Sequence, residues 1–187
     1  MPKFQHLNDH LLGANVFLFT QPGVPGEERA LETGIRMQST EDLRWARRDI
    51  KTVGLMAQVF AKQIAKQHGA DEALLIKDGY VTEGGSSSFF IIKGNTVITR
   101  PLSKDIPPGV TRRALMQILE QQAIVVDERL FTLDDALAAD EAFVTGASTY
   151  FYAVVNIDGH AIGTGKPGRL VKQLQRHYLD HIEANAI

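Results

Sequence analysis

An acidic residue in a glycine- and serine-rich segment is the first candidate for chemistry in this sequence. Residues 83–88 read Glu-Gly-Gly-Ser-Ser-Ser and lie between two stretches, 80–82 and 89–92, that each read as a strand. Glutamate is seldom buried unless it is paired, so stability alone gives little reason for a carboxylate here. Glycines let the backbone approach a ligand closely, and hydroxyls supply donors and acceptors. The segment therefore predicts a small-molecule site with Glu83 as an acidic anchor.

Lys51 is the second candidate, because it stands among apolar neighbours in the stretch 49–56. Removing a lysine from water favours its neutral amine and lowers its pKa, and a neutral amine can attack a carbonyl to form a Schiff base. Each residue also has an ordinary interpretation when taken alone. Lys51 is then a surface lysine with an apolar stem, and Glu83 is a turn residue.

Three further segments could bind an anion. Residues 107–113 open a predicted helix with Gly109 and Thr111, which offer free backbone N–H groups and a hydroxyl at the positive end of the helix dipole. Residues 145–149 are small and hydroxylic and could form a second anion nest. Residues 44–48 contain three arginines. The ordinary interpretations are a helix cap, a polar turn and a solvated basic cluster.

Taken together, these features ask for one cofactor. Pyridoxal phosphate needs a lysine for its Schiff base, an acid for its pyridinium nitrogen and a phosphate site. A metal is not expected, because the six histidines show no ligand spacing near Glu83.

Composition narrows the class of protein. A net charge of −2 gives no electrostatic reason to expect nucleic acid or an anionic membrane as a partner. The absence of cysteine excludes disulfides and thiolate sites. No apolar run approaches the roughly 20 residues of a membrane span, and residues 8–10 are polar where a signal peptide would be apolar. We expect a cytoplasmic protein.

The periodicity of apolar residues predicts an α+β domain built from hairpins and about three main helices. Turn signals at Asp78-Gly79 and Gly94-Asn95 join two pairs of strands, and a third turn signal, Asp158-Gly159, follows the strand 152–157. The expected helices are 49–67, 110–121, 133–138 and 168–183, and the expected strands are 16–20, 34–38, 72–77, 80–82, 89–93, 96–99, 123–128, 141–145 and 152–157.

The order and spelling of four motifs resemble the fold-type IV pyridoxal-phosphate enzymes. The motifs are Arg44-Trp45-x-Arg47-x-Asp49-Ile50-Lys51, Val81-Thr82-Glu83-Gly84 with its serines, Gly109-Val110-Thr111-Arg112 and Phe143-Val144-Thr145-Gly146. Within this class the spelling is most similar to the D-amino acid aminotransferases. The resemblance implies a strongly twisted mixed sheet or pseudo-barrel, pyridoxal phosphate as cofactor, an amino acid and a 2-oxo acid as substrates, and a homodimer.

The resemblance also implies a role for each residue. Lys51 would carry the cofactor and shuttle a proton, and Glu83 would accept a hydrogen bond from the pyridinium nitrogen. The residues expected around the cofactor ring and the lysine are Arg44, Ser86, Ser87 and Pro107. Those expected around the phosphate are Gly109, Val110, Thr111, Gly146, Ala147 and Ser148.

Two positions depart from the family pattern. Ala147 stands where the family often has a phosphate-binding threonine, so Thr145 or Ser148 could take that role. Gly85 stands where D-amino acid aminotransferases often have serine.

The domain organisation departs further. We expect residues 1–14 to be a tail or remnant, residues 15–187 to form the cofactor-binding large domain, and the family's amino-terminal small domain to be absent. Since that domain supplies the groups that grip the substrate carboxylate, we expect weak retention of cofactor and little transamination by this chain alone. Two alternatives stay open. One is a branched-chain aminotransferase or an aminodeoxychorismate lyase, and the other is a catalytically silent cofactor-binding or assembly domain.

Overall fold

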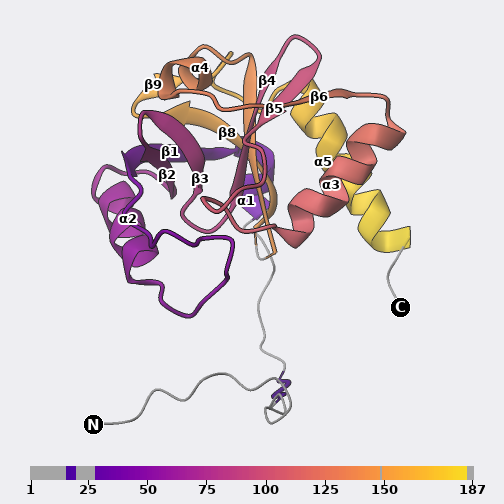
Figure 1. The fold of residues 1–187 in the computed structure, drawn as a ribbon. Coiled ribbons are helices and arrows are strands. Elements are labelled where there is room, and N and C mark those ends of the chain that lie inside the picture. Colours follow the sequence, from indigo (N-terminus) through magenta and orange to yellow (C-terminus); the bar gives the residue numbers. More distant parts are fainter. Residues whose placement is uncertain (1–15, 20–27, 148, 185–187) are drawn as a thin grey trace, which may run out of the picture.

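The computed structural model describes residues 16–19, 28–147 and 149–184, whose fold is shown in Figure 1. In chain order the elements are α1 (Glu28–Thr33), β1 (Ile35–Glu41), α2 (Met56–Gln67), β2 (Glu72–Lys77), β3 (Tyr80–Gly84), β4 (Ser88–Lys93), β5 (Thr96–Thr99), α3 (Val110–Gln121), β6 (Val125–Glu128), α4 (Leu133–Leu137), β7 (Glu141–Gly146), β8 (Tyr150–Ile157), β9 (His160–Ala161) and α5 (Arg169–Ala184).

The strands of the described residues form one mixed sheet in the order β3-β2-β1-β8-β7-β4-β5-β6, with β9 paired to β8. β1 runs parallel to both β2 and β8, and β5 runs parallel to β6, while the remaining pairs are antiparallel. Ser88 on β4 pairs with Thr145 on β7, so the segments after β3 and after β7 meet at one edge of the sheet.

The two predicted hairpins and the third predicted turn are confirmed, and that turn joins β8 to the short strand β9, which was not predicted. Asp78-Gly79 and Asp158-Gly159 both take the left-handed backbone, with φ of 52° and 81° in the first turn and 51° and 83° in the second. Consecutive left-handed residues make the tight turn whose twist suits paired strands. The first of these turns sets the register of β2 against β3, and β3 carries Glu83.

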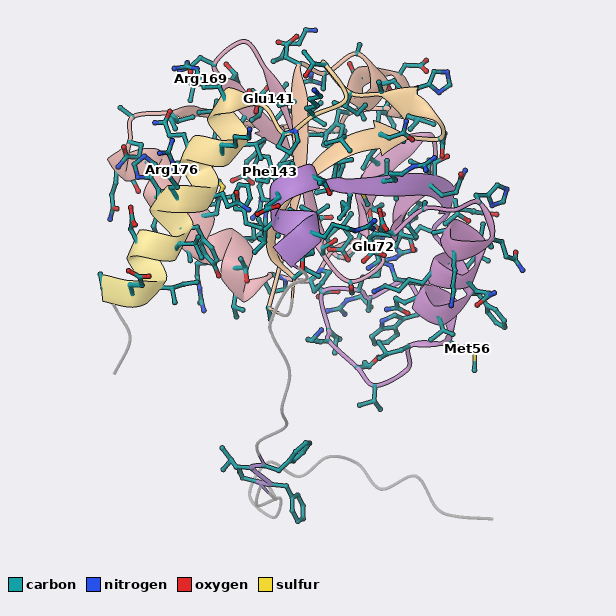
Figure 2. All side chains as sticks on the ribbon, turned by 180° about the vertical axis from the view of Figure 1, so that it is seen from behind. Met56, Glu72, Glu141, Phe143, Arg169 and Arg176 are labelled. Atoms are coloured by element: carbon teal, nitrogen blue, oxygen red, sulfur yellow. The ribbon has the colours of Figure 1, made fainter. Side chains whose placement is uncertain are left out.

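Helices cover the sheet on both faces. α3 and α5 lie side by side over one face (Figure 1), where the rings of Phe90, Phe143 and Phe151 stack with centroids 4.7 and 4.5 Å apart. Glu141 fixes the start of α5, because its carboxylate accepts the N–H groups of Leu170 and Val171 at 3.0 and 2.8 Å (Figure 2). α2 packs on β1 and β2 through Ala61 and Ala65.

The predicted helix over residues 49–67 is wrong in its first third, because α2 begins at Met56. Thr52, Val53 and Gly54 disfavour a helix, two through their branched side chains and one through its flexible backbone. The larger apolar residues of α2 face solvent instead of the core, as Met56 does in Figure 2. The periodicity therefore marked a real apolar face but not a buried one.

The predicted strand over residues 16–20 is wrong for its described part, because residues 16–19 belong to no helix or strand. Residues 1–14, predicted to be a tail, lie outside the described residues. None of the described helices is long and apolar enough to cross a membrane.

Candidate functional site

Glu83 lies near the end of β3, and its side chain is buried in the interior. Only 4 % of the residue is exposed. Its carboxylate accepts a hydrogen bond from the guanidinium of Arg44, which is also largely buried. Among the described residues no other group bonds to Glu83, so one carboxylate holds one fixed cation and keeps acceptor capacity for a further partner.

A second carboxylate holds Arg44 in place. Asp42, which follows β1, accepts from Arg44 through both oxygens at 2.9 and 2.8 Å. Asp42 also accepts from the hydroxyl of Thr82 at 2.8 Å and pairs with Arg48 at 3.2 Å. A bidentate guanidinium–carboxylate pair fixes both planes, so Arg44 is oriented before it reaches Glu83.

Burial is the main influence on the Glu83 carboxyl and raises its pKa to about 7. The charge and hydrogen bond of Arg44 act in the opposite direction, as does the more weakly felt charge of Lys51. Burial also opposes ionisation of Asp42, but the hydrogen bond and charge of Arg44 outweigh it and keep the pKa of Asp42 below its usual range. The pKa values of the two neighbouring acids are therefore shifted in opposite directions. Asp42 is held in its charged form, while the ionisation of Glu83 would change with a new charged partner.

Lys51 lies in the loop between β1 and α2 and is exposed to solvent. The expectation of a lysine removed from water at a helix start is therefore wrong for this structure, because the loop that replaces the helix turns outward. The charge of Lys51 nevertheless acts weakly on Glu83 and lowers the pKa of that carboxyl slightly. A small cavity of about 50 Å³ brings Lys51 together with Arg44, Pro107 and Gln58.

The bend at residues 85–87 connects β3, which carries Glu83, to β4. The hydroxyl oxygen of Ser87 is buried and has no hydrogen-bond partner among the described residues. The same holds for the hydroxyl oxygens of Thr145 and Thr149. Buried hydroxyls are normally paired, so three orphaned ones near one edge of the sheet indicate a place for a polar ligand.

Gly146 brings this bend against the turn that follows β7. A Cβ at position 146 would lie 2.5 Å from Thr149 Oγ1 and 3.3 Å from the backbone oxygen of Ser86. A side chain at position 146 would force Thr149 to move and would crowd the backbone of Ser86, so glycine favours the close approach of the two segments. Ala147 is exposed in the same turn, and Ser148, also predicted to bind the cofactor, lies outside the described residues.

The start of α3 lies next to the beginning of β4. Gly109 precedes the helix with no side-chain cap, which leaves the first-turn N–H groups at Val110 and Thr111 without a side-chain acceptor. A Cβ on Gly109 would lie 3.1 Å from Ser88 Oγ, so this helix start abuts the beginning of β4. The predicted phosphate motif thus lies beside the serine bend.

Sequence reasoning missed the ionic cluster behind Arg44. Asp105, in the loop that also carries Pro107, pairs with Lys77 at 2.6 Å, Arg100 at 2.9 Å and Arg48 at 3.1 Å. Arg48 links Asp105 to Asp42, and so joins the loop of Lys51 to the loop of Pro107. Sequence spacing does not predict ion pairs between loops that lie this far apart in the chain. The basic cluster at residues 44–48 was the one feature of the sequence that indicated charged partners here.

Comparison with known proteins gives the chain relatives. The sequence model of the family Amino-transferase class IV matches residues 5–157. The D-alanine aminotransferase of Bacillus licheniformis is 38% identical over 164 residues, which are 88% of this chain and 58% of that protein. The corresponding enzyme of Staphylococcus haemolyticus is 38% identical over 83% of this chain and 55% of its own. The chain therefore spans little more than half the length of these relatives.

Solved structures share the fold. The branched-chain amino acid aminotransferase of Escherichia coli matches with a TM-score of 0.78 and 26% identity, over 87% of this chain and 55% of that one. The T.th. branched-chain enzyme with pyridoxamine 5′-phosphate matches with a TM-score of 0.79 and 29% identity, over 88% and 55%. These likenesses confirm the predicted α+β class and the mixed, curled sheet.

Proposed function

Because this chain belongs to the class IV aminotransferases, we propose that it binds pyridoxal phosphate through Lys51 and serves in the transfer of an amino group between a D-amino acid and a 2-oxo acid. The identity to D-alanine aminotransferases supports the substrate class. The buried Glu83, paired with the Arg44 that shares a cavity with Lys51, is the observation that carries the proposal.

The residues present fit this cofactor. The buried Glu83 carboxyl, whose pKa burial raises to about 7, would gain a cationic partner in a protonated ring nitrogen, and such a partner favours the ionised acid. Orphaned hydroxyls on Ser87, Thr145 and Thr149, together with the first turn of α3, suit the phosphate and the polar edge of the ring. In this proposal Val110, Thr111, Gly146, Ala147 and Ser148 hold the phosphate, and Pro107 and the bend at 85–87 flank the ring.

The cofactor, when bound, supplies an electron sink for the α-carbon of the substrate. The remaining work belongs to the chain. Glu83 would accept a hydrogen bond from the ring nitrogen and favour its protonated form, while Arg44 orients the carboxylate and favours its charged form. The Lys51 amine would hold the cofactor and would take up and return the proton of the substrate's α-carbon.

The partners are proposals as well. Beyond the two small substrates, we propose a second copy of this chain, because many large apolar side chains of residues 43–64 are exposed. These side chains are Leu43, Trp45, Ile50, Val53, Leu55, Met56, Val59, Phe60 and Ile64. Soluble monomers rarely expose large apolar patches, and the exposed residues lie on both sides of Lys51 in the sequence. A cytoplasmic location is proposed because the sequence holds no cysteine and no apolar span.

Transamination of branched-chain L-amino acids is the second candidate, and the likeness to branched-chain aminotransferases favours it. The identity to those structures is lower than to the D-alanine enzymes, 26% and 29% against 38%. A direct comparison of D-alanine with L-leucine as amino donor, with 2-oxoglutarate as acceptor, separates the two.

The test begins with binding. Pyridoxal phosphate is added to the purified chain, the complex is reduced with borohydride, and the digest is analysed by mass spectrometry. We expect the cofactor mass on the peptide that contains Lys51 and on no other lysine peptide. A Lys51→Ala variant that still holds cofactor covalently would remove the assignment. Turnover is a separate measurement, so a low rate by this chain leaves the binding result intact.

A further inference from the structure

The hydroxyl of Ser86 is held from behind by a buried acid. Glu72, the first residue of β2, is largely buried (Figure 2). One of its oxygens accepts the N–H of Ala73 at 2.8 Å, and the other accepts the Ser86 hydroxyl at 3.1 Å. A buried carboxylate at a strand start is costly unless it is paired, so its contacts with the bend call for an explanation.

Lys62 completes this arrangement from α2. Its ammonium lies 3.2 Å from Glu72 and donates to the Ser86 hydroxyl at 2.7 Å. The serine hydroxyl therefore accepts from Lys62 and donates to Glu72, which uses its single proton and fixes its rotation. The Lys62 side chain is 45 % exposed and that of Glu72 is 7 % exposed, so the pair connects the surface of α2 to the buried side of the bend.

The backbone of the bend lies directly on this pair. Gly85 donates its N–H to the carbonyl of Ala73 at 3.1 Å. A Cβ on Gly85 would lie 2.7 Å from Glu72 Oε1 and 3.3 Å from Lys62 Cε. The absence of a side chain at Gly85 lets the bend come this close.

We propose that Lys62 and Glu72 are positioning residues that hold the bend at residues 85–87 in the shape that the cofactor requires. The inference rests on the proposed function. Because both groups occupy the Ser86 hydroxyl, Ser86 would serve the cofactor through its backbone, and the orphaned hydroxyl of Ser87 would be the one left for the ligand. α2, which also contributes Gln58 to the cavity beside Lys51, thereby sets the geometry of the bend.

If this salt bridge had a purely structural role, its removal would lower the free energy of unfolding and leave the conformation of the bend at residues 85–87 unchanged. Two measurements distinguish the roles. The first is amide hydrogen exchange of residues 85–88 in the cofactor-free protein, which reports the local opening of the bend. The second is the Kd for pyridoxal phosphate, with the free energy of unfolding recorded for every variant.

The variants are Lys62→Met, Glu72→Gln, Ser86→Ala and the double variant Lys62→Met/Ser86→Ala, with Lys62→Arg as the conservative replacement. Losing a charge-assisted hydrogen bond should speed exchange in the bend and raise Kd, each by about tenfold. Since Lys62 acts through the Ser86 hydroxyl, the double variant should be no worse than the poorer single variant. Lys62→Arg should stay within about twofold of the unmodified chain, because it keeps the donor and the charge.

Lys66→Met is the matched control, because Lys66 is an exposed lysine one turn further along α2. Unchanged exchange and Kd in Lys62→Met, or equal changes in Lys66→Met, would overturn the proposal. Should Glu72→Gln fail to fold, the half-exposed Lys62 still decides. If the unmodified chain binds no pyridoxal phosphate, the proposed function fails, and the exchange measurement alone decides the role of the pair.

Discussion

The guanidinium of Arg44 donates to the carboxylate of Glu83 across 39 positions of sequence, and both side chains are only 6 % exposed. The opposite edge of the same guanidinium is held by Asp42. The Asp42–Arg44 pair therefore fixes the position of the Glu83 carboxylate, which can still accept a further hydrogen bond. This relationship supplies the first prediction.

Replacing Arg44 with methionine should destabilise the fold strongly. Asp42 and Glu83 would both stay buried without their shared cation, and breaking a buried pair typically costs about 3–5 kcal/mol. The pKa of Glu83, already raised to about 7, should rise further because Arg44 is the main group that lowers it. Urea unfolding at neutral pH measures the first effect, and titration of Glu83 by NMR measures the second.

Arg47→Met is the control for that variant, because Arg47 pairs only with Asp49 among the described residues and lies at the surface. We expect its unfolding curve to match that of the unmodified chain, since exposed pairs contribute little. If both variants lost the same free energy of unfolding, the loss would follow from removing any arginine of residues 44–48. The pairing of Arg44 with Asp42 and Glu83 would then not be the cause.

The pH dependence of stability should carry the signature of Glu83. Its pKa is about 7 in the fold and near its ordinary value of 4.5 when unfolded, so between these values the folded state binds more protons. The stabilisation is therefore complete below the unfolded pKa and is lost as pH rises through about 7. Glu83→Gln cannot titrate, so the unmodified chain should lose on the order of 2 kcal/mol relative to Glu83→Gln between about pH 5 and pH 8. Parallel stability profiles for the two proteins would contradict this.

The sequence predicted the hairpins and α3 well because their signals are local. Asp78-Gly79 and Asp158-Gly159 allow a left-handed backbone wherever they occur, and α3 has the predicted bounds of Val110–Gln121. The association of the site motifs was expected from the needs of one cofactor and from a family resemblance, not from a rule about which segments meet, and the structure places Ser88 beside Thr145 and Gly109.

The loop of Lys51 could not be predicted in this way. Its apolar residues have helical spacing, but periodicity does not state whether a face is covered by the same chain, and here it is not. The ionic cluster of Asp42, Arg48 and Asp105 also escaped, because its members meet through the tertiary fold and not through spacing. Both features depend on contacts between residues far apart in the chain, which periodicity and spacing in the sequence do not predict.

Restoring a hydroxyl at position 147 should tighten phosphate binding. Ala147 is exposed in the turn after β7, where a threonine side chain meets no packing restriction. Ala147→Thr should lower the Kd for pyridoxal phosphate by about threefold to tenfold, as expected for one added hydrogen bond. Ala147→Val has the same shape without the hydroxyl and should leave Kd unchanged. The gain should vanish for pyridoxal, which has no phosphate; a gain that persists there would place the added contact elsewhere.

The apolar surface of residues 43–64 should control self-association. Phe60 lies in the part of it formed by α2 and is more than half exposed, so a lysine there should not harm the monomer. Aromatic residues at the centre of an interface often dominate its energy, so Phe60→Lys should raise the dimer dissociation constant by at least about tenfold. Sedimentation across a range of concentrations measures it. Leu179→Lys makes the same change on an exposed apolar residue of α5 and should leave the dimer intact. A chain that stays monomeric at every concentration, or equal weakening by both variants, would show that this surface is not where two copies meet.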